Sequence, residues 1–177
     1  DIDAREWDAV VGVGRLFQSH AWLGVLEAGS IVDYTPIYVV VRYSGGAMIA
    51  TAAAFVMPTS LITLSSGPFR SAVEAIQQRL PWFFRPRILE CGSPLGPGNG
   101  ISLRKGVAMA QVAPILAKAL DGVAAQQRAR LIVLRDLIDA ELPIAEAFAP
   151  WGFVPVEGFP TMSLPIRWTS YEAYWRA

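Results

Sequence analysis

The chain has 177 residues, 15 of them basic and 15 acidic, and this length is enough for one domain with a core of its own. The zero net charge and the lack of a lysine-rich block argue against a DNA-binding protein, and no apolar run reaches the roughly 20 residues of a membrane span. With one cysteine, Cys91, and one histidine, His20, the chain can form neither an internal disulfide nor a Cys/His zinc site, so we expect no metal.

The composition is more apolar than that of an average soluble domain, with 53% hydrophobic and 17% charged residues. We therefore expect part of the apolar surface to be covered by another domain or by a partner subunit. Because no charged-then-apolar signal segment opens the sequence, we expect a cytoplasmic protein.

The first thirty residues predict two helices. The stretch "DAREWDAVVGVGRLF" has apolar residues at helical spacing around Trp7, although its glycines weaken the second half. The stretch "SHAWLGVLEAG" is the stronger pattern, because Ser19 is a suitable N-cap and Gly29 stands where a helix stops.

A β-hairpin follows these helices. The runs "TPIYVVVRY" and "AMIATAAAFVMP" are strand-like, and they flank a turn at residues 44–46 in which glycine supplies the positive φ. A little further on, "SLITLSS" predicts another short strand.

The middle of the chain predicts a helix and then a βαβ unit. The helix is "SAVEAIQQRL", which a proline stops. The unit consists of the strand "RPRILECGS", a helix from residue 107 to about 127, and the buried strand "ARLIVLRDL". Parallel strands joined in this way bind ligands at their carboxyl ends, where the loop "GNGISLRKG" lies.

Four short elements end the chain. The stretch "PIAEAFAPWG" predicts a short helix with proline at its start and glycine at its end. The runs "FVPV" and "TMSLPIRW" predict two closing strands, and "TSYEAYWRA" has the pattern of a last helix.

This order of elements resembles the GNAT acyltransferase fold. The stretch "LFQSHAWLGVLEAG" is similar to the F-x-S-x-x-W/F-L-x-x-L-E opening of FemAB-like and peptidoglycan-bridge-type acyltransferases, and "WGFVPVEGFPTMSLPIRWTSYEAYWRA" is similar to the stretch that closes their domain. The resemblance covers essentially the whole chain. It implies an α/β fold with a central mixed sheet flanked by helices. It also implies one GNAT-like domain over residues 1–177, as the first of two tandem domains.

The glycine-rich loop before the long helix is the candidate cofactor site. In GNAT enzymes this loop carries Q/R-x-x-G-x-G/A, and its backbone N–H groups bind the cofactor pyrophosphate at the helix N-terminus. The nearest match here is Arg104-Lys105-Gly106-Val107-Ala108, which is one residue short between the basic position and the glycine. The competing interpretation is an ordinary loop with glycines and solvated charges, and the broken spacing favours a degenerate cradle.

Glu90, Cys91 and Gly92 end the strand beside that loop. In GNAT-like sheets the two parallel strands splay apart and admit the pantetheine arm of the donor, so the resemblance implies a splayed edge at these residues with Gly92 as the bulge. The phosphates would then lie against residues 104–108 and the reacting carbonyl near Glu90. Glu90 is the candidate general base for an acceptor amine, or else a structural carboxylate. Cys91 is a candidate nucleophile, but its one possible histidine partner, His20, lies far away in the sequence. We favour the alternative, because a buried cysteine is more often inert packing.

Aromatic residues beside arginines form a second candidate surface. Trp82, Phe83 and Phe84 precede Arg85 and Arg87, a pattern that can stack the nucleobases of a nucleotide-bearing donor. The competing interpretation, which we favour, is a hydrophobic corner that anchors the preceding helix.

Three functions remain open from the sequence and its resemblance, and one of them is a small-molecule-binding protein without catalysis. The first is an N-acyltransferase that moves an acyl or aminoacyl group from acyl-CoA or aminoacyl-tRNA to a small-molecule or peptide amine. A backbone N–H would polarise the carbonyl in such an enzyme. The second is a non-catalytic GNAT-like recognition domain that supports a second catalytic domain. We expect a second GNAT-like domain or a homo-oligomeric partner.

Overall fold

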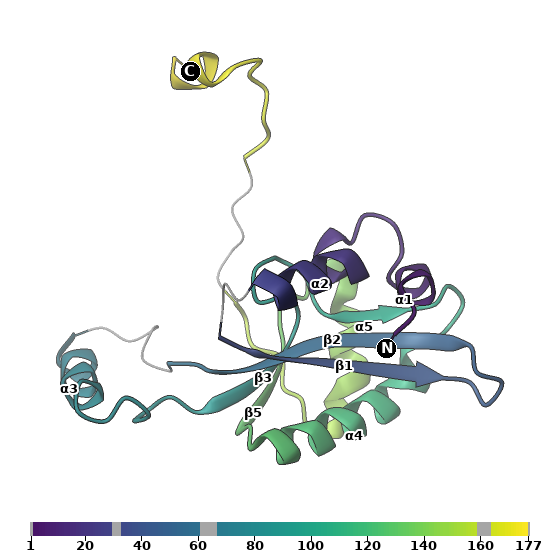
Figure 1. The fold of residues 1–177 in the computed structure, drawn as a ribbon, viewed down its shortest axis with the longest axis horizontal. Coiled ribbons are helices and arrows are strands. Elements are labelled where there is room, and N and C mark those ends of the chain that lie inside the picture. Colours follow the sequence, from purple (N-terminus) through teal and green to yellow (C-terminus); the bar gives the residue numbers. More distant parts are fainter. Residues whose placement is uncertain (1, 30–32, 61–66, 159–163, 177) are drawn as a thin grey trace.

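The computed structural model describes residues 2–29, 33–60, 67–158 and 164–176 (Figure 1). Within these ranges five strands form one mixed sheet, and helices cover both of its faces. The strands are β1 (Thr35–Arg42), β2 (Met48–Pro58), β3 (Arg87–Cys91), β4 (Ile101–Leu103) and β5 (Leu131–Leu134). The expected α/β class with a central mixed sheet is confirmed.

The sheet has the strand order β1-β2-β3-β5, and β4 pairs with β2 beyond the end of β3. β1, β2 and β3 are antiparallel neighbours, so the predicted hairpin is present, whereas β3 and β5 run parallel. Residues 48–56 of β2 are all buried. Because this central strand is covered on both faces, its sequence is nearly continuously apolar and does not alternate with polar residues.

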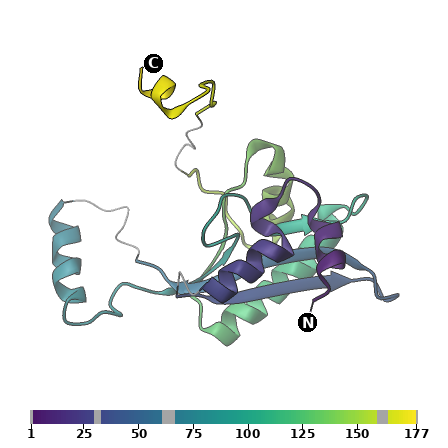
Figure 2. The same ribbon diagram turned by 45° about the horizontal axis from the view of Figure 1, so that its top comes forward.

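Two hydrophobic clusters lie on opposite faces of the sheet. Ala52 and Ala54 belong to the cluster beneath α4 and α5, whereas Ala53 belongs to the cluster beneath α1 and α2. Successive side chains of a strand point to opposite faces, so the clusters are two separate cores. Figures 1 and 2 show α1 and α2 on one side of the strands and α4 on the other. These helices are α1 (Ala4–Val11), α2 (His20–Gly29), α4 (Met109–Gln127) and α5 (Leu142–Phe148).

Trp7 anchors the N-terminal helix pair on the sheet. Its ring is almost fully buried and lies edge-on to Tyr38 of β1, with the ring centroids 5.7 Å apart. The indole Nε1 donates to the backbone oxygen of Gln18, 2.9 Å away, and so ties α1 to the turn before α2. The predicted N-cap of α2 is also present, because the Ser19 hydroxyl accepts from the N–H of Trp22 at 3.3 Å.

The predicted βαβ unit is present as β3, α4 and β5, although both strands are shorter than their apolar runs. The helix before the unit, α3 (Gly67–Gln77), begins four residues ahead of the run "SAVEAIQQRL". The candidate strand "SLITLSS" lies almost wholly outside the described residues. The sequence pattern therefore located the βαβ unit and the helix before it, but not their ends.

The prediction of two closing strands is wrong for the described residues. Residues 153–158 and 164–168 carry no strand, and their branched apolar side chains are largely exposed. Each run has a proline, Pro155 or Pro165, which removes a donor from any ladder. The outer edge of β5 is therefore not paired with another strand within the described ranges.

The remaining elements are short. The predicted C-terminal helix is α6 (Tyr171–Trp175), capped by the Ser170 hydroxyl, which accepts from the N–H of Ala173 at 3.2 Å. Single 3₁₀ turns are η1 (Leu16–Gln18), η3 (Asp139–Glu141) and η4 (Ala149–Trp151). None of the helices in the described ranges has both the length and the apolar character to cross a membrane.

Replacing Trp7 by Phe should lower the free energy of unfolding by about 2 kcal/mol, because the variant loses a buried hydrogen bond and part of a buried ring. Urea unfolding followed by circular dichroism measures the change. Trp175→Phe is the matched control, since Trp175 is largely exposed, and its unfolding midpoint should equal that of the wild type. Equal midpoints for both variants would show that the Trp7 anchor contributes nothing to stability.

Candidate functional site

β3 and β4 are two halves of one strand, interrupted by residues 92–100, which we call the bulge loop. The two halves pair with β2 on either side of Ala53, so nine residues lie opposite this single residue. The carbonyl of Ala53 accepts from the N–H of Gly92, and its N–H donates to the carbonyl of Gly100, both at 3.0 Å. The loop is thus a very large β-bulge that leaves and rejoins the sheet at one point.

Gly100 has no room for a side chain. An added Cβ would lie 1.9 Å from the Ala53 oxygen and 2.7 Å from the Gly92 nitrogen. Both are backbone atoms held by the sheet, so they cannot move aside as the end of a side chain can. The close approach of the two loop ends therefore requires glycine at this position.

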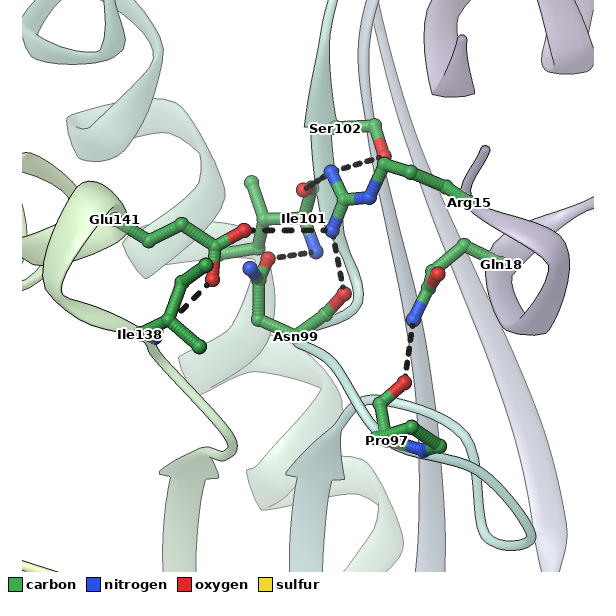
Figure 3. Close-up of polar contacts among 8 residues, drawn as sticks. All are labelled: Arg15, Gln18, Pro97, Asn99, Ile101, Ser102, Ile138 and Glu141. Atoms are coloured by element: carbon green, nitrogen blue, oxygen red, sulfur yellow. Dashed lines mark hydrogen bonds and ion pairs between the residues drawn. The ribbon is translucent and has the colours of Figure 1, made fainter. Parts of the chain in front are cut away.

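The bulge loop rests on the segment between α1 and α2. The indole Nε1 of Trp22 donates to the Ser93 hydroxyl at 3.1 Å, and the Phe17 ring lies against a glycine of the loop. The side-chain amide of Gln18 donates to the backbone oxygen of Pro97 at 3.3 Å (Figure 3). These contacts hold the loop above the face of the sheet that α1 and α2 cover.

Arg15 extends from the same segment into the space between β4 and the chain that follows β5 (Figure 3). We call this space the gap. Its Nη1 donates to the Ile101 carbonyl at 2.9 Å and to the Ser102 hydroxyl at 3.1 Å. Its Nη2 donates to the Asn99 carbonyl at 2.8 Å and lies 3.9 Å from Oε1 of Glu141. Burial lowers the pKa of Arg15 and the Glu141 carboxylate raises it, but a guanidinium keeps its charge across the physiological range.

Asn99 is fully buried, and the backbone sets the orientation of its amide. Its Oδ1 accepts from the N–H of Ile101 at 2.9 Å. Its Nδ2 points toward the Glu141 side of the gap in Figure 3 and has no hydrogen-bond acceptor within the described part of the chain. A buried donor without an acceptor costs about 1–3 kcal/mol, so an incoming oxygen acceptor would be stabilised here.

Glu141 reaches the gap from the opposite side, at the start of α5. Its Oε2 accepts from the N–H of Ile138 at 3.4 Å, and its Oε1 faces Arg15. A carboxylate, a guanidinium and a buried amide N–H therefore converge between β4 and the chain that follows β5. Groups of this kind can polarise a carbonyl and accept a proton from an amine.

The expected splaying of β3 from β5 is wrong for the strand residues themselves. β3 pairs with β5 in parallel from residue 88 to residue 91 without a break. The interruption begins at Gly92, the residue expected as the bulge. There the aliphatic part of Arg135 lies 2.7 Å from the position of a Cβ, so a side chain already fills this space. A pantetheine arm would find no free strand edge at Glu90 or Cys91.

Glu90, the candidate base, is engaged at both carboxylate oxygens. Oε1 lies 3.4 Å from the hydroxyl of Thr59, and Oε2 lies 3.4 Å from Nη1 of Arg135. The side chain is 16% exposed. These contacts are those of a structural ion pair, and the catalytic role of Glu90 stays a prediction.

Arg104 lies far from Glu90 along the same edge of β2. Its backbone N–H donates to the backbone oxygen of Ile49 at 2.9 Å. Its Nε donates to the backbone oxygen of Met48 at 2.7 Å, so the side chain is turned toward the hairpin. Glu90 pairs with Phe55, six residues further along β2, a separation of about 20 Å along a strand. The structure does not bring the predicted base and the predicted phosphate-binding arginine together.

The other four residues of the predicted cradle lie at the start of α4. Lys105 and Gly106 form an exposed turn with Gly106 at a φ of +88°, and Val107 packs against the core. Ala108 is the N-cap and makes no side-chain cap bond. Their role in binding a phosphate stays a prediction.

Sequence reasoning missed Arg15, Asn99 and Glu141, which lie far apart along the chain. Only Asn99 carried a signal, because it stands between two glycines in "GNG". The aromatic pattern of the first helices, by contrast, does mark part of the site, since Phe17 and Trp22 hold the bulge loop.

In comparisons with known proteins, the chain is similar in sequence to part of a longer protein. No protein-family model and no solved structure matches it. Over 99 residues, 55% of its length, the chain is 31% identical to "Putative 8-amino-7-oxononanoate synthase 2" of Mycobacterium tuberculosis strain CDC 1551 / Oshkosh. The protein of that name from strain ATCC 25618 / H37Rv shows the same identity and coverage. The matched stretch spans 13% of the length of each relative.

Gly100→Ala should lower the free energy of unfolding by about 3 kcal/mol, because the new methyl group meets backbone on two sides. Chemical denaturation measures the loss. Gly24→Ala is the control, since nothing lies within 4 Å of that position in α2 and alanine favours a helix. An unchanged Gly100→Ala variant would contradict the close approach of the loop ends.

The Cys91 thiol should resist alkylation in the folded protein. It is fully buried, and burial raises its pKa to about 12, so the reactive thiolate is scarce at neutral pH. Labelling with iodoacetamide at pH 8 should be negligible in buffer and complete in urea, as read by mass spectrometry. Rapid labelling of the folded protein would show that Cys91 is accessible and would reopen its candidacy as a nucleophile.

Proposed function

We propose that the protein is an N-acyltransferase of GNAT-like architecture, which moves an acyl or aminoacyl group from acyl-CoA or aminoacyl-tRNA to an amine. The observation that carries the proposal is the interrupted strand. A helix pair and a hairpin lead into it, a long helix follows it, and a parallel strand ends beside the interruption. The relatives are named as synthases, which supports a group-transfer enzyme without specifying the donor.

Within that enzyme, we assign to this domain the role of a supporting, recognition half. An extended donor would have to lie between β4 and the chain after β5, and Arg15, Asn99 and Glu141 fill this gap. Entry of the donor molecule would require the Arg15 guanidinium to break its hydrogen bonds to three oxygen acceptors at once. The engaged carboxylate of Glu90 supports the same role, with the transfer step located in a second domain.

A second candidate function places the transfer in this domain, and the free Nδ2 of Asn99 favours it. In this case the 3.9 Å contact between Arg15 and Glu141 opens when the donor binds. Nδ2 of Asn99 donates to the oxygen of the reacting carbonyl, and Glu141 accepts the proton of the attacking amine. The bond to the donor's thioester sulfur or ester oxygen then breaks as the new amide bond forms.

Turnover of the full-length protein with acyl-CoA and with charged tRNA tests both candidates. In the supporting role, Asn99→Ala and the double substitution of Arg104 and Gly106 by alanine should each leave kcat within about twofold of the wild type. A loss of about 100-fold in Asn99→Ala, the size expected for a lost carbonyl donor, would instead establish the second candidate. Lys118→Ala, on the exposed side of α4, is the control for any general effect of substitution. No transfer from either donor would overturn the acyltransferase proposal.

A further inference from the structure

The segment between β2 and β3 forms an arm, residues 67–86, which stands away from the sheet in Figures 1 and 2. The arm is ordered by its own contacts. The side-chain amide of Gln77 donates to the backbone oxygen of Phe83 at 2.8 Å. The rings of Phe69 and Phe84 meet edge-on with centroids 6.0 Å apart. The helix α3 and the loop after it therefore form one small unit.

The arm exposes large apolar side chains to solvent. Trp82 is 71% exposed and Phe69 54%, and Ile76 and Leu80 are exposed as well. Only Val73 of α3 is buried. A group of this size that no element within the described ranges covers marks a contact surface rather than scattered exposure.

The charge of the arm differs from that of the chain. The arm holds three arginines against one glutamate, whereas the whole chain is neutral. Glu74 is paired with Arg70 at 2.7 Å, so it does not offset the other cations. The side chains of Arg79 and Arg85, on either side of Trp82, make no hydrogen bond or ion pair within the described part of the chain. Two arginines without a partner in the described part of the chain therefore stand in the sequence on either side of the exposed Trp82.

We propose that this arm docks on an anionic lipid surface. Trp82 and Leu80 enter the interfacial region of the bilayer, and Arg79 and Arg85 contact the lipid phosphates. Arginine and tryptophan suit this position because each has an apolar body and a polar end. The contact is peripheral, as it uses the arm and no element of the sheet.

The side chains favour lipid over nucleic acid as the partner. Bases stack on aromatic rings, and the aliphatic Ile76 and Leu80 contribute nothing to such a contact. Both gain from burial among acyl chains. Phosphate tracking along a nucleic acid also requires a row of cations, whereas two arginines of this arm lack a partner within the described part of the chain.

Co-sedimentation of the full-length protein with vesicles tests the proposal. The protein should pellet with vesicles of equal parts phosphatidylglycerol and phosphatidylcholine, and at least tenfold less with phosphatidylcholine alone. Neutralising both arginines (Arg79→Gln with Arg85→Gln) should weaken binding to the anionic vesicles about 30-fold. Trp82→Ala with Leu80→Ser should weaken it on the order of tenfold, while circular dichroism stays unchanged.

Matched substitutions elsewhere separate the arm from general effects. Trp151→Ala removes another exposed tryptophan, and Arg128→Gln with Arg130→Gln removes two exposed arginines of the body. Both controls should bind like the wild type. Absence of pelleting, or equal loss in arm and control variants, would overturn the proposal. So would arm-dependent binding of tRNA, or arm-dependent self-association in analytical ultracentrifugation, if either occurs without vesicle binding.

Discussion

The paired hydrogen bonds of Ala53 hold both ends of the bulge loop at one point of the central strand, and the candidate site is built around that junction. In an unbroken sheet these N–H and carbonyl groups would bond one residue of the neighbouring strand. Here they bond Gly100 and Gly92, which are separated by seven residues of loop. β4 therefore continues the line of β3, while the loop between them carries Asn99 into the gap beside β5. Without a glycine at position 100 the two ends could not approach each other.

The side chain of Arg15 fills the space beside that junction. A partly buried guanidinium is stable only where oxygen atoms replace its water, and three acceptors on residues 99–102 provide this environment. The Glu141 carboxylate adds charge compensation from the other side of the gap at a longer distance. The cluster therefore joins the α1–α2 segment, the interrupted strand and the start of α5. It also occupies the space in which an extended ligand would lie against the sheet.

The parts of the fold that were predictable are those that depend on local sequence patterns. The caps and apolar spacing of the helices, the hairpin turn, and the run of buried residues in β2 each depend on neighbours along the chain. The prediction of two closing strands was wrong because a period-two pattern of apolar residues takes no account of proline. Pro155 and Pro165 have no backbone N–H to donate to a neighbouring strand. An interruption does begin at Gly92, as the resemblance implied, although its length could not be read from a bulge motif.

The candidate site was less predictable because its contacts join distant residues. Arg15 meets Ile101 and Ser102 across more than 80 positions, and no spacing rule connects them. The glycines of "GNG" were interpreted through phosphate chemistry, whereas Gly100 serves the close approach of two backbone segments. Glycine frequency alone does not distinguish these two uses, since both need a missing side chain.

The shared attachment of the loop ends also affects how this region can evolve. Because the loop leaves and rejoins the sheet at Ala53, insertions and deletions between its ends leave every strand pair in register. Such changes have a small effect on stability, because doubling the length of a flexible loop raises the entropic cost of closing it by only about 0.6 kcal/mol. The rim of the gap can therefore be remodelled by length variation while the sheet beneath it keeps its shape.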